Sequence, residues 1–336
     1  MREAFLYEKL ACEQVQCRLC AHYCLIKPGG RGVCTVRENR EGILYSLVYN
    51  RPIAQHIDPI EKKPLFHFLP GSLSYSIATV GCNFRCRFCQ NANISQMPRD
   101  EKRIVGQEVS AEEVVAEAKA HGCASISYTY TEPTIFGEYV YDIATLARQA
   151  GIKNVLVTNG YQSPEAREKL GPIIDAANVD LKSFKESFYK EQCGAKLAPV
   201  LETLTSFKEQ GVWIEVTTLI IPGLNDSPVE LKEIAGFIAS RLGAETPWHI
   251  SRFHPDYRLT DRPGTPVATL ERAAQIGRAA GLKYVYLGNA PGAGGETTCC
   301  PGCGARLIDR LGFTISLNRV PEGTCPECGA RVDGVF

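Results

Sequence analysis

The sequence predicts an α/β protein whose centre is a partial, open TIM-type barrel of about six to seven βα units. Strand-like and helix-like patterns alternate through the middle of the chain, and cysteines cluster before, within and after that alternation. The 336 residues are 44% hydrophobic and 22% charged, which is typical of a globular protein. We expect an N-terminal Cys-rich metal-binding module at residues 1–60, the barrel at 61–290 and a small Cys-rich ribbon at 291–336.

The N-terminal module is expected from four closely spaced cysteines, Cys17-x2-Cys20-x3-Cys24-x9-Cys34. The glycine-rich run at residues 29–32 precedes the last of them and permits a tight turn. Four thiolates at such spacing can close around Zn²⁺ or hold a second iron–sulfur cluster. The spacing leaves both choices open, and we favour zinc.

The barrel is expected from seven strand-like runs separated by helical patterns. The predicted strands cover residues 74–80, 124–130, 154–158, 178–181, 212–221, 248–253 and 284–288. Helix starts are indicated by a capping box at Ser110, by Pro133, by Ser163-Pro164, by Ser227-Pro228, and by patterns beginning near Pro199 and Ala268. Such alternation implies a parallel sheet with outer helices, and six or seven repeats are too few for a closed barrel of eight.

The middle cysteines, Cys82-x3-Cys86-x2-Cys89, follow the first predicted barrel strand directly. They therefore lie on a loop at the carboxyl end of a strand, where α/β barrels carry their chemistry. Three thiols without a fourth nearby suit a [4Fe–4S] cluster that leaves one iron open to a substrate or cofactor. A three-cysteine zinc site is the alternative.

The C-terminal cysteines form two knuckles of the form Cys-Pro-x-Cys-Gly. Cys300 and Cys303 form the first, and Cys325 and Cys328 the second, with strand-like runs between them. Two residues between thiols let one turn direct both sulfurs at one ion, so we expect a zinc ribbon of structural type.

The middle group resembles the signature of the radical S-adenosylmethionine (SAM) superfamily, Cys-x3-Cys-x-Phe-Cys. The resemblance implies that the open iron binds SAM and that reductive cleavage gives a 5′-deoxyadenosyl radical, which abstracts hydrogen from the substrate. It also implies that Phe88 contacts the adenine, and that an electron donor such as flavodoxin or ferredoxin is needed.

Further motifs resemble the pyruvate formate-lyase activating enzyme branch of that superfamily. Tyr130-Thr131-Glu132 resembles the Gly-Gly-Glu motif, so Glu132 and backbone carbonyls would bind the SAM amino group. Asp180, Lys182 and His254 would line the SAM pocket. The residues alone allow a structural role for each of these positions. Asp180 and Lys182 would form an ion pair with each other. His254 would be a loop histidine whose hydrogen bonds are satisfied locally, and Glu132 would orient a helix N-terminus.

One position departs from the activating enzymes. These carry Asp before Thr-Asn-Gly as a ligand of a monovalent cation, and this chain has Val157 there. Taken over its whole length, the chain resembles the radical SAM member of the AmmeMemoRadiSam system. That resemblance implies Memo-like and AMMECR-like partners, and a protein is one candidate substrate.

The charge balance and the lack of targeting signals bear on the function class and on the cellular location. Lys and Arg together number 37, as do Asp and Glu, so RNA modification is disfavoured. The N-terminus lacks the apolar stretch of a signal peptide, and no run is long enough for a membrane span, so we expect cytoplasmic location and reduced thiols. Cys193 is a weak catalytic candidate, and a structural thiol is the simpler reading. A non-enzymatic iron–sulfur or zinc interaction protein is the remaining alternative.

Overall fold

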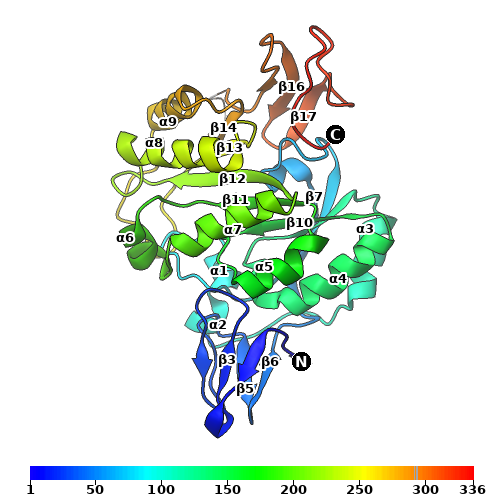
Figure 1. Cartoon of the computed structure of the whole chain (residues 1–336), viewed down its shortest axis with the longest axis vertical. Helices are drawn as coiled ribbons and strands as arrows, with labels where there is room; N and C mark the ends of the chain where they lie inside the picture. Colours follow the sequence, from blue (N-terminus) through cyan, green and yellow to red (C-terminus); the bar gives the residue numbers. More distant parts are fainter. Residues whose placement is uncertain (291, 293) are drawn as a thin grey trace.

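An eight-stranded sheet forms the centre of the protein in the computed structural model, which describes residues 1–290, 292 and 294–336 (Figure 1). The spatial order is β14-β13-β12-β11-β10-β9-β8-β7, with parallel pairing from β8 to β14 and an antiparallel edge strand β7. The strands are β7 (Pro52–Pro59), β8 (Leu73–Thr79), β9 (Ser125–Tyr128), β10 (Lys153–Thr158), β11 (Ala176–Asp180), β12 (Trp213–Ile220), β13 (Trp248–Arg252) and β14 (Val285–Gly288).

Helices connect successive parallel strands, as the predicted alternation requires. They are α1 (Ala92–Ser95), α2 (Met97–Asp100), α3 (Ala111–Ala120), α4 (Gly137–Gln149), α5 (Pro164–Leu170), α6 (Glu186–Phe188), α7 (Ala198–Glu209), α8 (Pro228–Phe237) and α9 (Val267–Ala279). Serine caps begin three of them: Ser110 forms the predicted capping box, and Ser163 and Ser227 each accept from a first-turn backbone N–H. Among the described strands β7 and β14 are the two sheet edges, so the prediction of an open barrel is confirmed.

The N-terminal module packs at the carboxyl ends of the parallel strands. Its two small sheets contain β1 (Arg2–Glu3), β2 (Tyr7–Lys9), β3 (Val15–Cys17), β4 (Leu25–Ile26), β5 (Arg37–Arg40) and β6 (Ile43–Ser46). Cys20 forms an isolated bridge with Gln162 beyond β10, and the His22 ring bonds the Asn83 carbonyl at 2.8 Å. Strand β7 falls within residues 1–60, the range predicted for this module, yet it pairs with β8 as part of the large sheet.

The C-terminal ribbon lies at the other end of the long axis (Figure 1) and consists of β15 (Thr298–Cys299), β16 (Arg306–Leu311) and β17 (Thr314–Asn318). It is fastened by Arg310, whose guanidinium is buried, donates to the Phe66 carbonyl at 2.8 Å and lies 4.2 Å from the Phe66 ring centre. Val335 also pairs with Phe68 in a parallel bridge. These contacts make the ribbon part of the barrel wall. Its predicted start, residue 291, lies outside the described residues.

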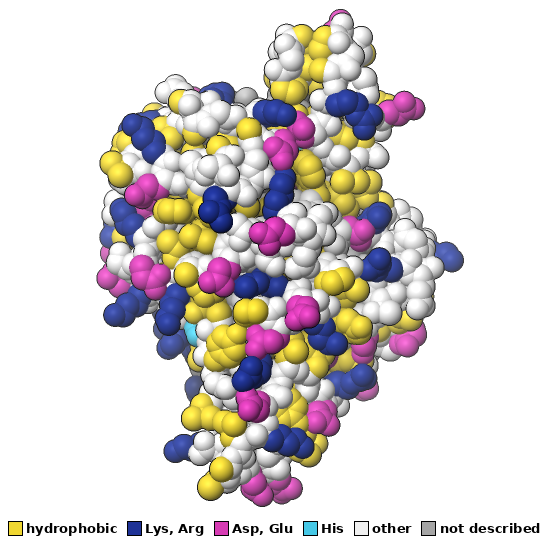
Figure 2. All heavy atoms as spheres, in the orientation of Figure 1, with side chains coloured by type: hydrophobic (Ala, Val, Ile, Leu, Met, Phe, Trp, Pro, Cys, Tyr) yellow, Lys and Arg dark blue, Asp and Glu magenta, His cyan; other side chains and the backbone are white. Residues whose placement is uncertain are grey.

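Two surface properties agree with the composition. Positive and negative side chains are interspersed over the face shown in Figure 2, without a single-sign field there. Of the helices that the structure describes, none has the length and apolar character needed to cross a membrane.

His67 joins the ribbon to the barrel and gives a prediction for acid stability. Its Nδ1 donates to the Asp333 carbonyl at 2.7 Å, and its Nε2 accepts from the Tyr286 hydroxyl at 2.6 Å, so the neutral ring is held in one tautomer. Burial lowers the pKa of His67 from 6.5 to about 4. The unfolded chain gains this proton near pH 6.5 and the folded protein only near pH 4, so stability falls between those values.

We expect His67 to remove about 3 kcal/mol from the unfolding free energy across that interval. Urea unfolding of the wild type and of His67→Gln between pH 7 and pH 4.5 measures the difference. The variant should lose less stability on acidification, and an equal loss in both proteins would contradict the assignment.

Candidate functional site

A cavity of about 970 Å³ opens at the carboxyl ends of the parallel strands and continues into the barrel. Its walls come from the loops after β8, β9, β10, β11 and β14, from strands β12 and β13, from residues 61–66, and from the ribbon. It brings together seven residues that the sequence singled out, namely Cys82, Cys86, Cys89, Phe88, Glu132, Asp180 and Lys182.

The cysteine loop is held between the barrel and the N-terminal module. Gly81 has φ +103°, and a Cβ there would lie 2.8 Å from Val36, so glycine is needed for the close approach. The Cys82 sulfur accepts from the Phe84 N–H at 3.3 Å, and the Cys89 sulfur lies 3.2 Å from the Ser95 hydroxyl. Three soft thiol ligands with hydrogen-bond donors around their sulfurs fit an iron–sulfur cluster.

Asp180 and Lys182 do pair, with 2.8 Å between the Asp180 carboxylate and Lys182 Nζ, and both line the cavity. Lys182 Nζ also lies 5.8 Å from the centre of the Phe88 ring. Burial alone would lower the pKa of Lys182, but the Asp180 carboxylate and the Cys86 thiol hold it well above its usual value. The ammonium therefore stays charged beside the cysteine loop.

Glu132 lines the cavity but is engaged by the protein. Its carboxylate accepts from Thr134, from the Thr158 hydroxyl at 2.8 Å and from the Asn159 backbone N–H at 2.8 Å. Burial raises the pKa of Glu132, and these donors oppose that rise. In this arrangement Glu132 caps the turn at Pro133 and ties it to β10, and a direct contact with SAM stays a prediction.

His254 and Cys193 lie apart from the cavity lining. His254 is exposed on the rim, where its ring lies 3.4 Å from the Gln90 side chain. Cys193 is fully buried behind the cysteine loop; its carbonyl accepts from the Arg85 N–H at 2.8 Å, and its free thiol is hydrogen-bonded to the Cys86 sulfur. This position agrees with a structural thiol.

Tyr130 replaces the first glycine of the resembling motif and still has a left-handed backbone, with φ +60°. Such a conformation is unfavourable for a bulky residue. Asn91, two residues after Cys89, donates to the Tyr130 carbonyl at 2.8 Å, and the Tyr130 hydroxyl bonds to Asp58 on β7. These contacts hold the strained backbone next to the cysteine loop.

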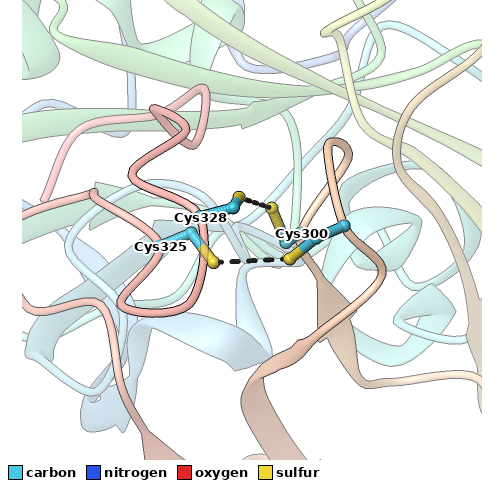
Figure 3. A group of neighbouring side chains, drawn as sticks. Cys300, Cys325 and Cys328 are labelled. Carbon is cyan, nitrogen blue, oxygen red and sulfur yellow. Dashed lines mark hydrogen bonds between the residues drawn. The ribbon is translucent and has the colours of Figure 1, made fainter.

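The C-terminal cysteines form the one group of potential metal ligands whose atoms all lie within 4.8 Å of one another in the described part of the chain (Figure 3). The sulfur–sulfur distances are 3.6 Å for Cys300–Cys328 and 3.8 Å for Cys303–Cys325. Tetrahedral zinc with Zn–S bonds of about 2.3 Å separates its sulfurs by about 3.8 Å. The donor set therefore fits a closed Zn²⁺ site.

The N-terminal cysteines are less closely grouped. Cys17, Cys20 and Cys34 are buried, Cys24 is partly exposed, and the Cys24 sulfur accepts from the Val33 N–H at 3.4 Å. The choice between zinc and an iron–sulfur cluster at this group stays a prediction.

Several cavity residues could not be found from motifs. Thr217 and His249 point inward from the middle strands, Glu61 and Phe66 precede the barrel in sequence, and Leu311 to Phe313 belong to the ribbon hairpin. The available signal was weak: strand β12 places polar residues at alternating positions, where a barrel core normally carries large aliphatic side chains.

These features define a radical SAM enzyme. The sequence profile of the Radical SAM superfamily matches residues 76–235, which contain the cysteine triad, Glu132, Asp180 and Lys182. The chain therefore belongs to the radical SAM superfamily, and this membership implies a [4Fe–4S] cluster and SAM as cofactors.

The chain is also similar to individual known proteins. The chain is 49% identical to the uncharacterized protein MJ0808 of Methanocaldococcus jannaschii, and the alignment covers 100% of both chains. It is 24% identical to the pyruvate formate-lyase-activating enzyme of Clostridium pasteurianum, over 54% of this chain and 80% of that enzyme. The fold is similar to that of SuiB from Streptococcus suis, with TM-score 0.52, 16% identity, and coverage of 70% of this chain and 52% of SuiB.

Proposed function

We propose that the protein cleaves SAM reductively at a cluster held by Cys82, Cys86 and Cys89 and abstracts hydrogen from a substrate in the same cavity. The observation that carries the proposal is the convergence of these thiols with Phe88, Asp180 and Lys182 on one cavity. When bound, the reduced cluster and SAM supply a 5′-deoxyadenosyl radical for hydrogen abstraction.

In this proposal the chain's own residues bind the cluster and SAM and orient them. The three thiolates would hold the cluster and would leave one iron for the amino and carboxylate groups of SAM. Phe88 offers an apolar surface for the adenine, and the Asp180–Lys182 pair places both charges beside it. The Tyr130 turn presents its backbone to the SAM amino group, since Glu132 is occupied by protein donors.

A protein substrate, as in glycyl-radical activation, is supported by the distant similarity to activating enzymes. Val157 lines the cavity where those enzymes carry the cation-binding Asp, so the proposed chemistry proceeds without that cation site. Memo-like and AMMECR-like proteins are the partners that we propose, and flavodoxin or ferredoxin is the proposed electron donor. Zinc is the metal proposed for the ribbon.

Anaerobic reconstitution with iron and sulfide, followed by reduction with SAM present, tests the proposal. We expect release of 5′-deoxyadenosine and methionine. Its absence from protein with an intact cluster would overturn the proposed function.

Tyr130 gives a prediction for SAM affinity. Glycine adopts the left-handed backbone without penalty, whereas a β-branched residue is strained there by about 1–2 kcal/mol. Tyr130→Gly should therefore bind SAM within about threefold of the wild type, and Tyr130→Val at least about fivefold more weakly than Tyr130→Gly. Equilibrium SAM binding to the cluster-loaded proteins measures this, and equal affinity of the two variants would show that the backbone conformation is unimportant.

A further inference from the structure

We propose that the deep part of the cavity, between Glu61, Thr217 and the ribbon hairpin at Leu311–Phe313, is the substrate compartment, and that it takes an amine or amide carried on an apolar chain. This inference rests on the proposed function, because the compartment adjoins the predicted SAM site. It assigns a class of ligand to residues that lie outside the superfamily motifs.

The space in the cavity allows a second ligand. Sites for drug-sized molecules typically have volumes of roughly 300–1,000 Å³, and this cavity of about 970 Å³ is at the upper end of that range. The cysteine loop and the Asp180–Lys182 pair line one part of it. Thr217 lies beside Asp180 on the neighbouring strand β12, and Glu61 precedes the barrel; both line the cavity, and neither is among the residues predicted to bind SAM.

Two buried polar atoms on this deep wall have no hydrogen-bond partner among the described residues. Glu61 is 1% exposed, and its Oε1 accepts from the Gly71 N–H at 2.9 Å, whereas its Oε2 is unpartnered. Thr217 is 8% exposed, and its hydroxyl is also unpartnered. Because a buried polar atom without a partner is destabilising, a ligand that bonds to either atom would be stabilised.

The cations of the cavity already have carboxylate partners. Lys62 Nζ lies 2.8 Å from Asp58, and Lys182 Nζ lies 2.8 Å from Asp180. Arg310 lies behind Glu61, with 3.7 Å between Arg310 Nε and Glu61 Oε1, and its other nitrogens donate to ribbon and barrel acceptors. Arg310 Nε also has no hydrogen-bond partner, but Arg310 does not line the cavity. Among the described residues that line the cavity, the charged atom without a partner is therefore the Glu61 carboxylate oxygen, which favours a hydrogen-bond donor and disfavours an anion.

Apolar side chains also line the cavity, beside the polar His249 and Ser251. Phe66 and Leu219 line it from the barrel, and Leu311 and Phe313 line it from the turn between β16 and β17. Leu311 is 79% exposed and Phe313 is 49% exposed, and hydrophobic side chains gather on the ribbon at the top of Figure 2. An apolar chain that enters beside this hairpin would cover them while its polar end reaches Glu61.

Three probes of equal length test the inference: hexylammonium, hexanamide and hexanoate. Their dissociation constants are measured by ligand-observed NMR on the reconstituted, SAM-bound protein. We expect hexylammonium to bind at least about tenfold more tightly than hexanoate, because charge-assisted hydrogen bonds are the stronger ones. Hexanamide should also bind more tightly than hexanoate.

Single-residue variants identify the side chains that cause the preference for hexylammonium and hexanamide over hexanoate. Glu61→Gln should reduce the difference between hexylammonium and hexanoate to less than about threefold, since the carboxylate charge is removed. Thr217→Val should weaken hexanamide, and Glu112→Gln, which changes an exposed carboxylate on α3, should leave all three constants unchanged. Melting curves establish that each variant is folded. Thr217→Val keeps the test decisive should Glu61→Gln fail to fold.

The inference is overturned if hexanoate binds as tightly as hexylammonium, or if Glu61→Gln keeps the full preference. Release of 5′-deoxyadenosine is measured on the same preparations. Intact release without a probe preference rejects the compartment alone, whereas a probe preference without release rejects the proposed function alone.

Discussion

Cys86→Ala is expected to lower 5′-deoxyadenosine release by at least about a hundredfold, which is beyond the effect of residues that only orient a metal ligand. Cys86 is 7% exposed and lies between Cys82 and Cys89 on the loop after β8. Without its thiolate the cluster has two protein ligands in place of three. Chromatographic quantification of 5′-deoxyadenosine, with iron counts on the same samples, measures the loss.

Cys123→Ala is the matched control for this variant. Cys123 is a buried thiol just before β9 that does not line the cavity, so cluster content and cleavage should both persist. Full cleavage by Cys86→Ala, or equal losses in both variants, would contradict the assignment of the triad.

Cys325→Ala is expected to remove the metal of the ribbon and to unfold it locally. Structural zinc sites contribute about 10–16 kcal/mol of binding free energy, so a ribbon of this size depends on its ion. Arg310 has a fully buried side chain in the folded protein and becomes accessible to trypsin when the ribbon opens. Metal analysis should show loss of zinc, and mass spectrometry should show new cleavage after Arg310.

Cys299→Ala is the control, because Cys299 is exposed, is adjacent to Cys300 and lies outside the four-sulfur group. It should keep the metal and resist trypsin at Arg310. Unchanged metal content in Cys325→Ala would show that this group is not the ligand set.

The fold could be predicted because its signals are local. The helix caps at Ser110, Ser163 and Ser227 depend on residues within one turn, and all three occur in the structure. Strands of alternating or apolar pattern appear within a few residues of their predicted ends. The cysteine knuckles of the ribbon likewise depend on two-residue spacing, and their sulfurs converge.

The deep cavity could not be predicted because it is assembled from distant segments. Glu61 meets Arg310 only when the ribbon packs against the open edge of the barrel, and neither residue belongs to a recognisable motif. For Glu132 and His254 the assignment to SAM stays a prediction. Motif resemblance assigned both to SAM, whereas the structure places donors around Glu132 and sets His254 on the rim.

The loss of glycine at Tyr130 illustrates why motif departures need a structure. The sequence shows only that the glycine is replaced, whereas the structure shows a left-handed backbone at Tyr130 that is held by Asn91 and Asp58. The contact of the Tyr130 side chain with β7 holds a backbone conformation that glycine would adopt without strain.

The central claim is that the cluster keeps one iron without a protein ligand and that SAM binds there. Electron–nuclear double resonance on the reduced, reconstituted protein with SAM labelled by ¹⁵N at its amino group tests this most directly. The account predicts a ¹⁵N coupling to the cluster that disappears when SAM is omitted. A cluster that binds four protein ligands and shows no coupling to labelled SAM would contradict it.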